Sequence, residues 1–179
     1  MSRKILSWKG CAILIGVTDD LLHDDRVTLW GLFLEVHEGI KRRLAHELRA
    51  EVGIPDAWLE VLLRIGRTPG QAVPMTQLAD MVLFSSGGFT KLADRMERAG
   101  LIRREPCPGD RRSSLATLTP EGRRLLDRAL AVHVPGLQRH LVDHLDAEQR
   151  RQLEEILRTF RSGLTAGPSR RADHGSAQS

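Results

Sequence analysis

The chain has 179 residues, 41% of them hydrophobic, which suits one domain with short arms. Its formal net charge is +4 and its isoelectric point is near 9.7, which suits a polyanionic partner. No apolar run approaches the roughly 20 residues of a membrane span, and Lys9 interrupts the apolar N-terminal segment without a following cleavage site, which argues against membrane insertion and a secretory signal. Cys11 and Cys107 have no metal or redox-pair spacing, so we expect a reduced cytoplasmic protein without metal or cofactor.

Two amphipathic helices are predicted in the first part of the chain, after an arm formed by residues 1–24. The first runs from about Asp25 to Glu51 and ends near Gly53. Its apolar residues recur at steps of three and four: Leu29, Leu32, Phe33, Val36, Ile40, Leu44 and Leu48. The second helix begins at Asp56 and ends at Thr68-Pro69-Gly70.

A helix-turn-helix is predicted next. A short helix runs from Thr76, a possible cap, to Met81, and a second helix runs from about Ser86 to Ala99, where Gly100 terminates it. Such a unit places the start of its second helix against base edges in the major groove of DNA. The alternative is an ordinary helix with a solvated basic face. The candidate DNA-binding residues here are Ser85, Ser86, Thr90, Lys91 and Arg95.

A hairpin with a basic tip follows this helix. Residues 101–105 and 114–118 read as two strands around a tip rich in proline and glycine. Asp110 and Arg112 are two residues apart and therefore point the same way, so that the carboxylate could hold the guanidinium for entry into a minor groove. Arg111 would then bind phosphate. A surface turn with an incidental salt bridge is the alternative.

Charge is concentrated in this part of the sequence. Residues 85–112 contain seven basic and four acidic side chains, a local net charge of +3, whereas residues 1–60 have a net charge of −2. The distribution favours a nucleic-acid partner for the helix and the hairpin together.

Two further helices complete the predicted fold. Thr119 is placed at an N-cap and Pro120 at the first helical position, and the helix they begin should extend towards His144 with a kink or break at Pro135-Gly136. Asp146 caps a last helix that runs to about Ser162. The residues after it, 164–179, are expected to be disordered.

A sensing site is predicted near the first helix. Trp30, Phe33 and His37 share one helix face and Trp58 opens the second helix, so they could line a pocket for a small aromatic or carboxylate ligand. Core packing with a partly buried histidine is the alternative. His133 and His140 could add to a basic or metal-binding pocket, but the histidines form no tight metal motif.

A second possible signal is oxidation. Cys107 lies between two prolines and beside the hairpin arginines, which would lower a thiol pKa and make it reactive. Oxidation at this position would disturb DNA contact directly.

Four strings of this sequence resemble the MarR family of transcriptional regulators, over roughly residues 28–162. They are LAD (78–80), FTKLADRMERAGLIRR (89–104), GDRRS (109–113) and LTPEG (118–122). By position, Asp110 and Arg112 fall on the family's Asp-x-Arg wing motif, and the candidate residues of the second helix fall on its recognition helix.

The resemblance implies a mainly α fold with a small β-hairpin wing, a winged helix-turn-helix that dimerises through its N- and C-terminal helices. It divides the chain into a dimerisation helix (25–54), a DNA-binding lobe (55–122) and C-terminal dimerisation helices (123–163). The implied function is a homodimeric repressor of a pseudopalindromic double-stranded DNA operator, released by a small-molecule effector or an oxidant.

Other functions stay open at this point. An oxidant-responsive regulator using Cys107 and a winged helix that binds protein rather than DNA are the alternatives. The sequence contains no P-loop, GxSxG, HExxH or paired-carboxylate signature, so we expect no enzyme.

Overall fold

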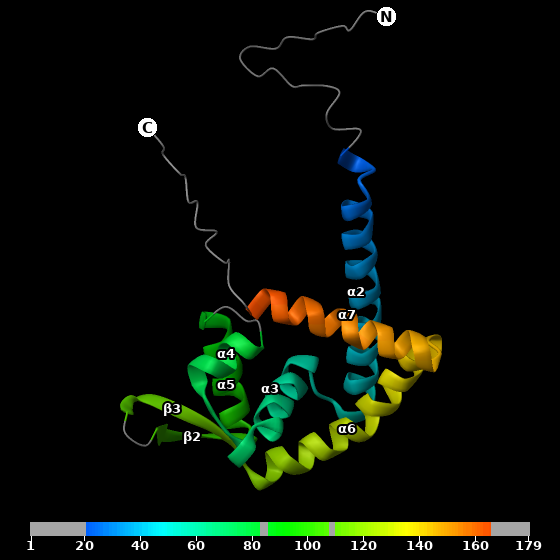
Figure 1. Cartoon of the computed structure of the whole chain (residues 1–179). Coiled ribbons are helices and arrows are strands. Elements are labelled where there is room, and N and C mark those ends of the chain that lie inside the picture. The colour runs from blue at the N-terminus through cyan, green and yellow to red at the C-terminus, as the bar shows by residue number, and fades with distance from the viewer. Residues whose placement is uncertain (1–20, 83–85, 108–109, 166–179) are drawn as a thin grey trace, which may run out of the picture.

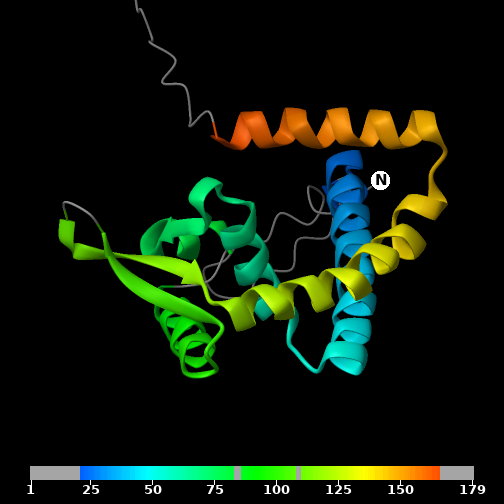
Figure 2. The same ribbon diagram turned by 90° about the horizontal axis from the view of Figure 1, so that it is seen from below.

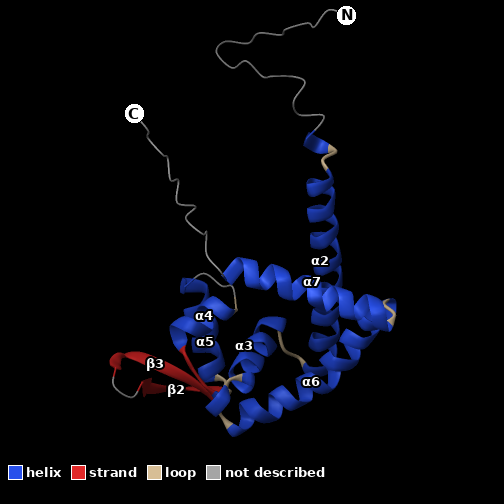
Figure 3. Ribbon diagram, in the orientation of Figure 1, coloured by secondary structure: helices blue, strands red, loops and turns tan. Residues whose placement is uncertain are grey.

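A computed structural model describes residues 21–82, 86–107 and 110–165 of the chain (Figure 1). Helices make up most of it, and a small sheet lies at one end beside α4 and α5 (Figure 3). Nearly all of the predicted N-terminal arm and C-terminal tail lies outside the described residues. No helix in the described part combines the length and the hydropathy needed to cross a bilayer.

Helix α2 (Asp25–Val52) has the bounds that its apolar period and flanking residues predict. The Asp24 carboxylate accepts a hydrogen bond of 2.8 Å from the backbone N–H of Arg26 and thereby caps the first turn. Gly53 ends the helix with a φ of 77°, a conformation that favours glycine. Only the C-terminal half of α2 packs against the rest of the chain, and the N-terminal half projects beyond it (Figure 1).

The helix-turn-helix is built from α4 (Met75–Met81) and α5 (Ser86–Arg98), preceded by α3 (Asp56–Arg67) and the 3-10 turn η1 (Pro69–Gln71). The prediction that Thr76 caps the short helix is wrong. Pro74 occupies the cap position, because the chain enters α4 directly from strand β1 (Ala72–Pro74). Thr76 lies exposed in the first turn.

The sheet has three antiparallel strands in the order β1-β3-β2, with β2 spanning Ile102–Cys107 and β3 spanning Asp110–Leu118. Val73 of β1 and Arg104 of β2 both pair with Ala116 of the central strand. Sequence reasoning missed β1 because a three-residue strand with one buried side chain shows no alternating pattern.

Helix α6 (Pro120–His140) begins as predicted, with the Thr119 hydroxyl accepting a hydrogen bond of 3.0 Å from the Gly122 N–H. Of the kink or break predicted at Pro135-Gly136, a kink stays a prediction, while the break is wrong, since the helix continues to His140. Packing explains why: a Cβ on Gly136 would lie 2.7 Å from Glu47 Oε2, so the glycine lets α6 press against α2 and the contact compensates for the interior proline. The turn η2 (Val142–His144) and helix α7 (Ala147–Thr165) follow.

The hydrophobic core lies between α3, α4, α5, the sheet and the first half of α6, as the residue positions show. Its fully buried side chains include Leu62, Ile65, Leu78, Leu92, Met96 and Ile102. Helix α6 passes under α3 and ends against α2, so it connects this core with the projecting helix (Figure 2).

Candidate nucleic-acid interface

Helix α5 buries one face against the core and exposes another to solvent. Phe89, Leu92 and Met96 are at most 3% exposed and hold the helix on the core, as the apolar stripe predicts. The candidate residues Thr90, Lys91 and Arg95 are exposed. Ser86 is the first residue of α5, and its side chain, like the whole of Ser85, lies outside the described part. The structure therefore places three of the five predicted contacts on one solvent-facing helix.

The predicted wing is the β2–β3 hairpin, which extends away from the core (Figure 1). Asp110 begins β3, and Arg111 and Arg112 follow it in the strand. The side chains of these three residues and the tip at 108–109 lie outside the described part, so the predicted pairing of Asp110 with Arg112 stays a prediction.

Arg104 of β2 has a role that sequence reasoning missed. Its guanidinium lies 2.5 Å from Asp94 Oδ1 and 3.3 Å from Glu97 Oε2, and its backbone N–H donates to Glu97 at 3.3 Å. Both acids belong to α5, three residues apart on the flank of the helix that faces β2. Arg104 thus joins the stem of the wing to α5 and does not add a free positive charge to the surface. A separation of ten residues between an arginine and an aspartate carries no local sequence signal.

The aromatic residues predicted for a sensing pocket lie mostly elsewhere. Trp30 and Phe33 are 59% and 47% exposed and stack on each other at 5.9 Å, on the half of α2 that projects from the molecule. Phe33 also stacks on His37 at 6.5 Å. Trp58 packs against the core, and its buried Nε1 has no hydrogen-bond acceptor among the described residues.

A cavity of about 790 Å³ does lie between α2, α3, the end of α4 and α6. Of the four predicted residues only His37 lines it, and its walls are aliphatic rather than aromatic. Burial lowers the pKa of His133, so this ring is neutral at pH 7, and its Nδ1 has no partner in the described part of the chain. The polar lining consists of His37, Lys41, Asp56, Glu60, Arg64 and His133.

His140 is hydrogen-bonded to Glu47 and does not line the cavity. Its Nε2 is 2.7 Å from Glu47 Oε1, and Arg139 is 2.9 Å from the other carboxylate oxygen. The hydrogen bond to His140, followed by that to Arg139, lowers the pKa of the Glu47 carboxyl. These contacts tie the end of α6 to α2. The described residues contain no cluster of three side chains suited to a metal ion.

Cys107 is the last residue of β2, is half-buried and pairs in register with Asp110. Its proximity to the wing is as predicted, while its reactivity stays a prediction. Cys11 lies outside the described residues.

Comparison with known proteins identifies the family. The model of the MarR family matches residues 52–113, which run from the end of α2 into β3. The structure of Sco3205, a MarR family regulator from Streptomyces coelicolor solved in complex with DNA, superposes with a TM-score of 0.71 at 29% identity, over 78% of this chain and 88% of that chain. From the end of α2 to the start of β3, this chain therefore matches the MarR family. The predicted winged helix-turn-helix fold is therefore confirmed.

Other MarR-family proteins are similar to this chain in structure or in sequence. AbsC, also from Streptomyces coelicolor, superposes with a TM-score of 0.72 at 29% identity, over 80% of this chain and 96% of that chain. The regulator PecS of Dickeya dadantii is 33% identical over 86 residues, 48% of this chain and 51% of PecS. The regulator MhqR of Bacillus subtilis is 31% identical over 93 residues, 52% of this chain and 62% of MhqR. The chain thus matches between half and two thirds of the length of these two curated relatives.

Proposed function

We propose that this protein is a homodimeric transcriptional regulator that binds a pseudopalindromic operator in double-stranded DNA and represses transcription. The exposed face of α5 supports the proposal: Thr90, Lys91 and Arg95 are exposed on this helix, which lies beside the hairpin (Figure 1). Short polar and long basic side chains on one helix suit base edges and phosphates in a major groove. The fold shared with Sco3205, which was solved with DNA, supports the same reading.

The wing completes the proposed interface. Arg112, held by Asp110, would enter the adjacent minor groove, and Arg111 would bind phosphate. Ser85 and Ser86 precede or begin α5, where backbone and hydroxyl groups of a recognition helix commonly meet the DNA backbone. The interface would then comprise eight residues: Ser85, Ser86, Thr90, Lys91, Arg95, Asp110, Arg111 and Arg112.

Dimerisation is supported by apolar surface that the subunit itself leaves uncovered. The N-terminal half of α2 and one face of α7 carry large exposed side chains, a composition expected of a subunit interface. They are Leu29, Trp30, Leu32, Phe33 and Val36 on α2, and Ile156, Leu157, Phe160 and Leu164 on α7. A two-fold dimer would set two α5 helices about 34 Å apart, one turn of DNA.

The test of DNA binding uses a fluorescent duplex enriched by the wild-type protein from a random pool. Because several phosphates are contacted, the affinity should fall steeply as salt rises. Arg112→Ala should weaken binding by roughly 1–3 kcal/mol without changing thermal unfolding. Arg151→Ala, on α7, is the control and should bind like the wild type. Salt-independent binding, or full affinity of the Arg112 variant, would argue against this interface.

For the effector, the cavity supports a small amphipathic anion. Aliphatic walls would take its apolar part, while Lys41 at the cavity wall would attract its charge. A panel of aromatic carboxylates should raise the unfolding temperature of the wild type and release the duplex, and Lys41→Met should lower both responses. Equal responses in the two proteins would place the effector elsewhere.

A further inference from the structure

The end of α5 is shaped by a left-handed residue. Gly100 has a φ of 70°, and its N–H donates to Glu97 O at 2.9 Å while the Leu101 N–H donates to Met96 O at 3.0 Å. These bonds satisfy carbonyls of the last helical turn. The carbonyl groups of Gly100 and Leu101 themselves accept hydrogen bonds from the residue that caps the start of α6.

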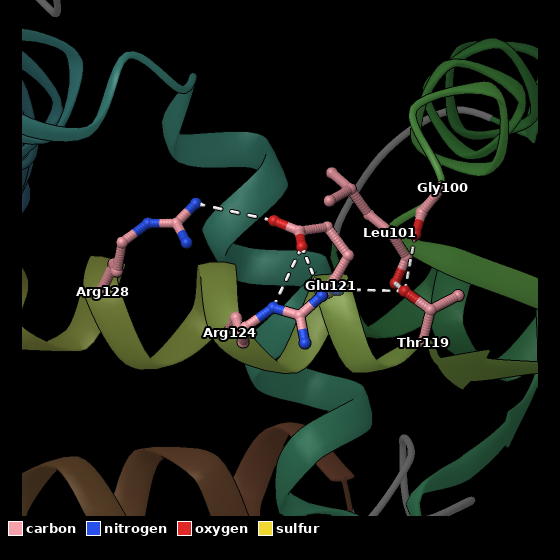
Figure 4. Close-up of polar contacts among 7 residues, drawn as sticks. Gly100, Leu101, Thr119, Glu121, Arg124 and Arg128 are labelled. Atoms are coloured by element: carbon pink, nitrogen blue, oxygen red, sulfur yellow. Dashed lines mark hydrogen bonds and ion pairs between the residues drawn. The ribbon is translucent and has the colours of Figure 1, made fainter.

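That residue, Thr119, bonds to both carbonyls (Figure 4). Its N–H donates to Leu101 O at 3.1 Å, and its hydroxyl oxygen lies 2.5 Å from Gly100 O and 3.2 Å from Leu101 O. A hydroxyl has one proton, and the shorter distance assigns it to Gly100 O. The same oxygen accepts the Gly122 N–H at 3.0 Å. One side chain therefore caps α6 and also holds the end of α5.

Gly122 allows this contact because it has no side chain. A Cβ at this position would lie 1.9 Å from Leu101 O and 2.9 Å from Leu101 C, which are backbone atoms that cannot rotate away. The first turn of α6 thus rests directly on the backbone that follows α5. We call Gly100, Leu101, Thr119 and Gly122 the α5–α6 joint.

The other end of α6 is fixed as well. Arg139 and His140 bind Glu47 of α2 at 2.9 and 2.7 Å, and α2 is the helix with the uncovered apolar surface. Helix α6 therefore runs from the α5–α6 joint to the proposed dimer helices (Figure 2). The angle at the joint sets how α5 is oriented relative to α2.

We propose that Thr119 is a positioning residue for operator recognition: its hydroxyl, by donating to the Gly100 carbonyl, fixes α5 against α6 and so fixes the spacing of the two α5 helices in the dimer. This rests on the proposed function, since it requires two recognition helices on one duplex. The proposal predicts that Thr119 sets which distance between the two half-sites the protein prefers. A residue that only stabilised the start of α6 would leave this preference unchanged.

The two roles of the hydroxyl can be separated by substitution. Aspartate is at least as good an N-cap as threonine and accepts the Gly122 N–H, but at neutral pH it has no proton for Gly100 O. Thr119→Asp should therefore keep α6 capped and lose the bond to α5. Thr119→Ser retains both bonds. Thr68→Asp, at the end of α3, is the matched control because it removes a hydroxyl that donates to Arg64 O at 2.9 Å outside the joint.

The experiment compares full-length variants on the enriched duplex and on versions with one or two base pairs inserted between the half-sites. Each inserted pair moves the second half-site by about 3.4 Å and rotates it. The readout is the dissociation constant on a lengthened duplex divided by that on the enriched duplex, for each variant. The negative charge that aspartate adds weakens binding to both duplexes alike and therefore cancels in this ratio. We expect the wild type, Thr119→Ser and Thr68→Asp to share one high ratio, and Thr119→Asp to lower it by about five-fold or more.

An unchanged ratio in Thr119→Asp would overturn the proposal, and so would a wild type that binds without spacing preference. If Thr119→Asp does not fold, Thr119→Gly supplies an uncharged N-cap about as good as threonine, and it has no side-chain donor for Gly100 O. Unfolding of both would also overturn it, because the joint would then serve stability rather than orientation. A wild type that binds no duplex would instead refute the proposed function.

Discussion

Arg104 lies in the basic stretch of the sequence, yet its charge is used inside the protein. Asp94 and Glu97 stand on α5, the helix proposed to face DNA, and Arg104 forms ion pairs with both, so that one positive charge offsets half of their negative charge. Without it, two carboxylates on that helix would repel the phosphate backbone. The number of basic residues in a segment therefore overstates the positive charge that is available to a DNA partner.

Arg104→Ala should weaken DNA binding by about ten-fold and change the free energy of unfolding by roughly 0–1 kcal/mol, since the ion pair is partly exposed. The affinity should be measured by anisotropy at two salt concentrations. Arg103→Ala, one residue earlier in β2 and exposed, is the control. If the loss is electrostatic, adding Asp94→Asn and Glu97→Gln to Arg104→Ala restores affinity. Failure of this rescue would assign the effect to the orientation of the wing.

Glu47 predicts a pH dependence of stability. Its pKa is lowered in the folded state by His140 and then Arg139, so its stabilising effect is complete above the pKa of the unfolded chain. The effect is lost as the pH falls through the lowered folded pKa, on the acid side of the usual glutamate range. The difference in unfolding free energy between the wild type and Glu47→Gln, measured in urea, should therefore be largest near neutral pH and shrink in acid. A constant difference would contradict this.

At the scale of elements, the sequence predicts what local chemistry controls. The bounds of α2 and the start of α6 follow from their capping side chains, Asp24 and Thr119, and from the apolar period. Strand β1 and the unbroken α6 could not be predicted, because partners distant in sequence determine them. Val73 forms a strand only beside Ala116, and Pro135 is accommodated only where Gly136 meets α2.

Gly122→Ala should be strongly destabilising, by about 3 kcal/mol or more, because the new methyl group would meet the Leu101 carbonyl. Gly87→Ala, in the first turn of α5 with nothing within 4 Å of a Cβ, is the matched control. It should be neutral or stabilising by up to about 1 kcal/mol. Urea unfolding without DNA measures both. Equal stability of the two variants would mean that α6 shifts freely on α5.

At the scale of the whole molecule, the buried core and the uncovered apolar surface lie on different elements. The core lies between α3, α4, α5, the sheet and the first half of α6, whereas α7 and the outer half of α2 expose apolar side chains. This also explains the placement of Trp30 and Phe33. The sequence grouped them correctly with His37 on one face of α2, but it could not show that only His37 of these three residues lies far enough along the helix to line the cavity.

Phe160→Glu should convert the protein to monomers, because it places a charge within the exposed apolar face of α7. Ser162→Glu, about half a turn away on the same helix, is the control and should remain dimeric. Light scattering after size-exclusion chromatography gives the mass, and the monomer should lose the salt-sensitive binding to a two-half-site duplex. A dimeric Phe160 variant would place the interface elsewhere.

The strand order β1-β3-β2 leaves β1 and β2 each with one unpaired side, and each contains a proline, Pro74 or Pro106. A proline has no N–H to offer an incoming strand, and β1 is only three residues long. Lateral addition of another chain to this sheet is therefore discouraged on both sides. This protects the small sheet from edge-to-edge aggregation and leaves the proposed self-association to α2 and α7.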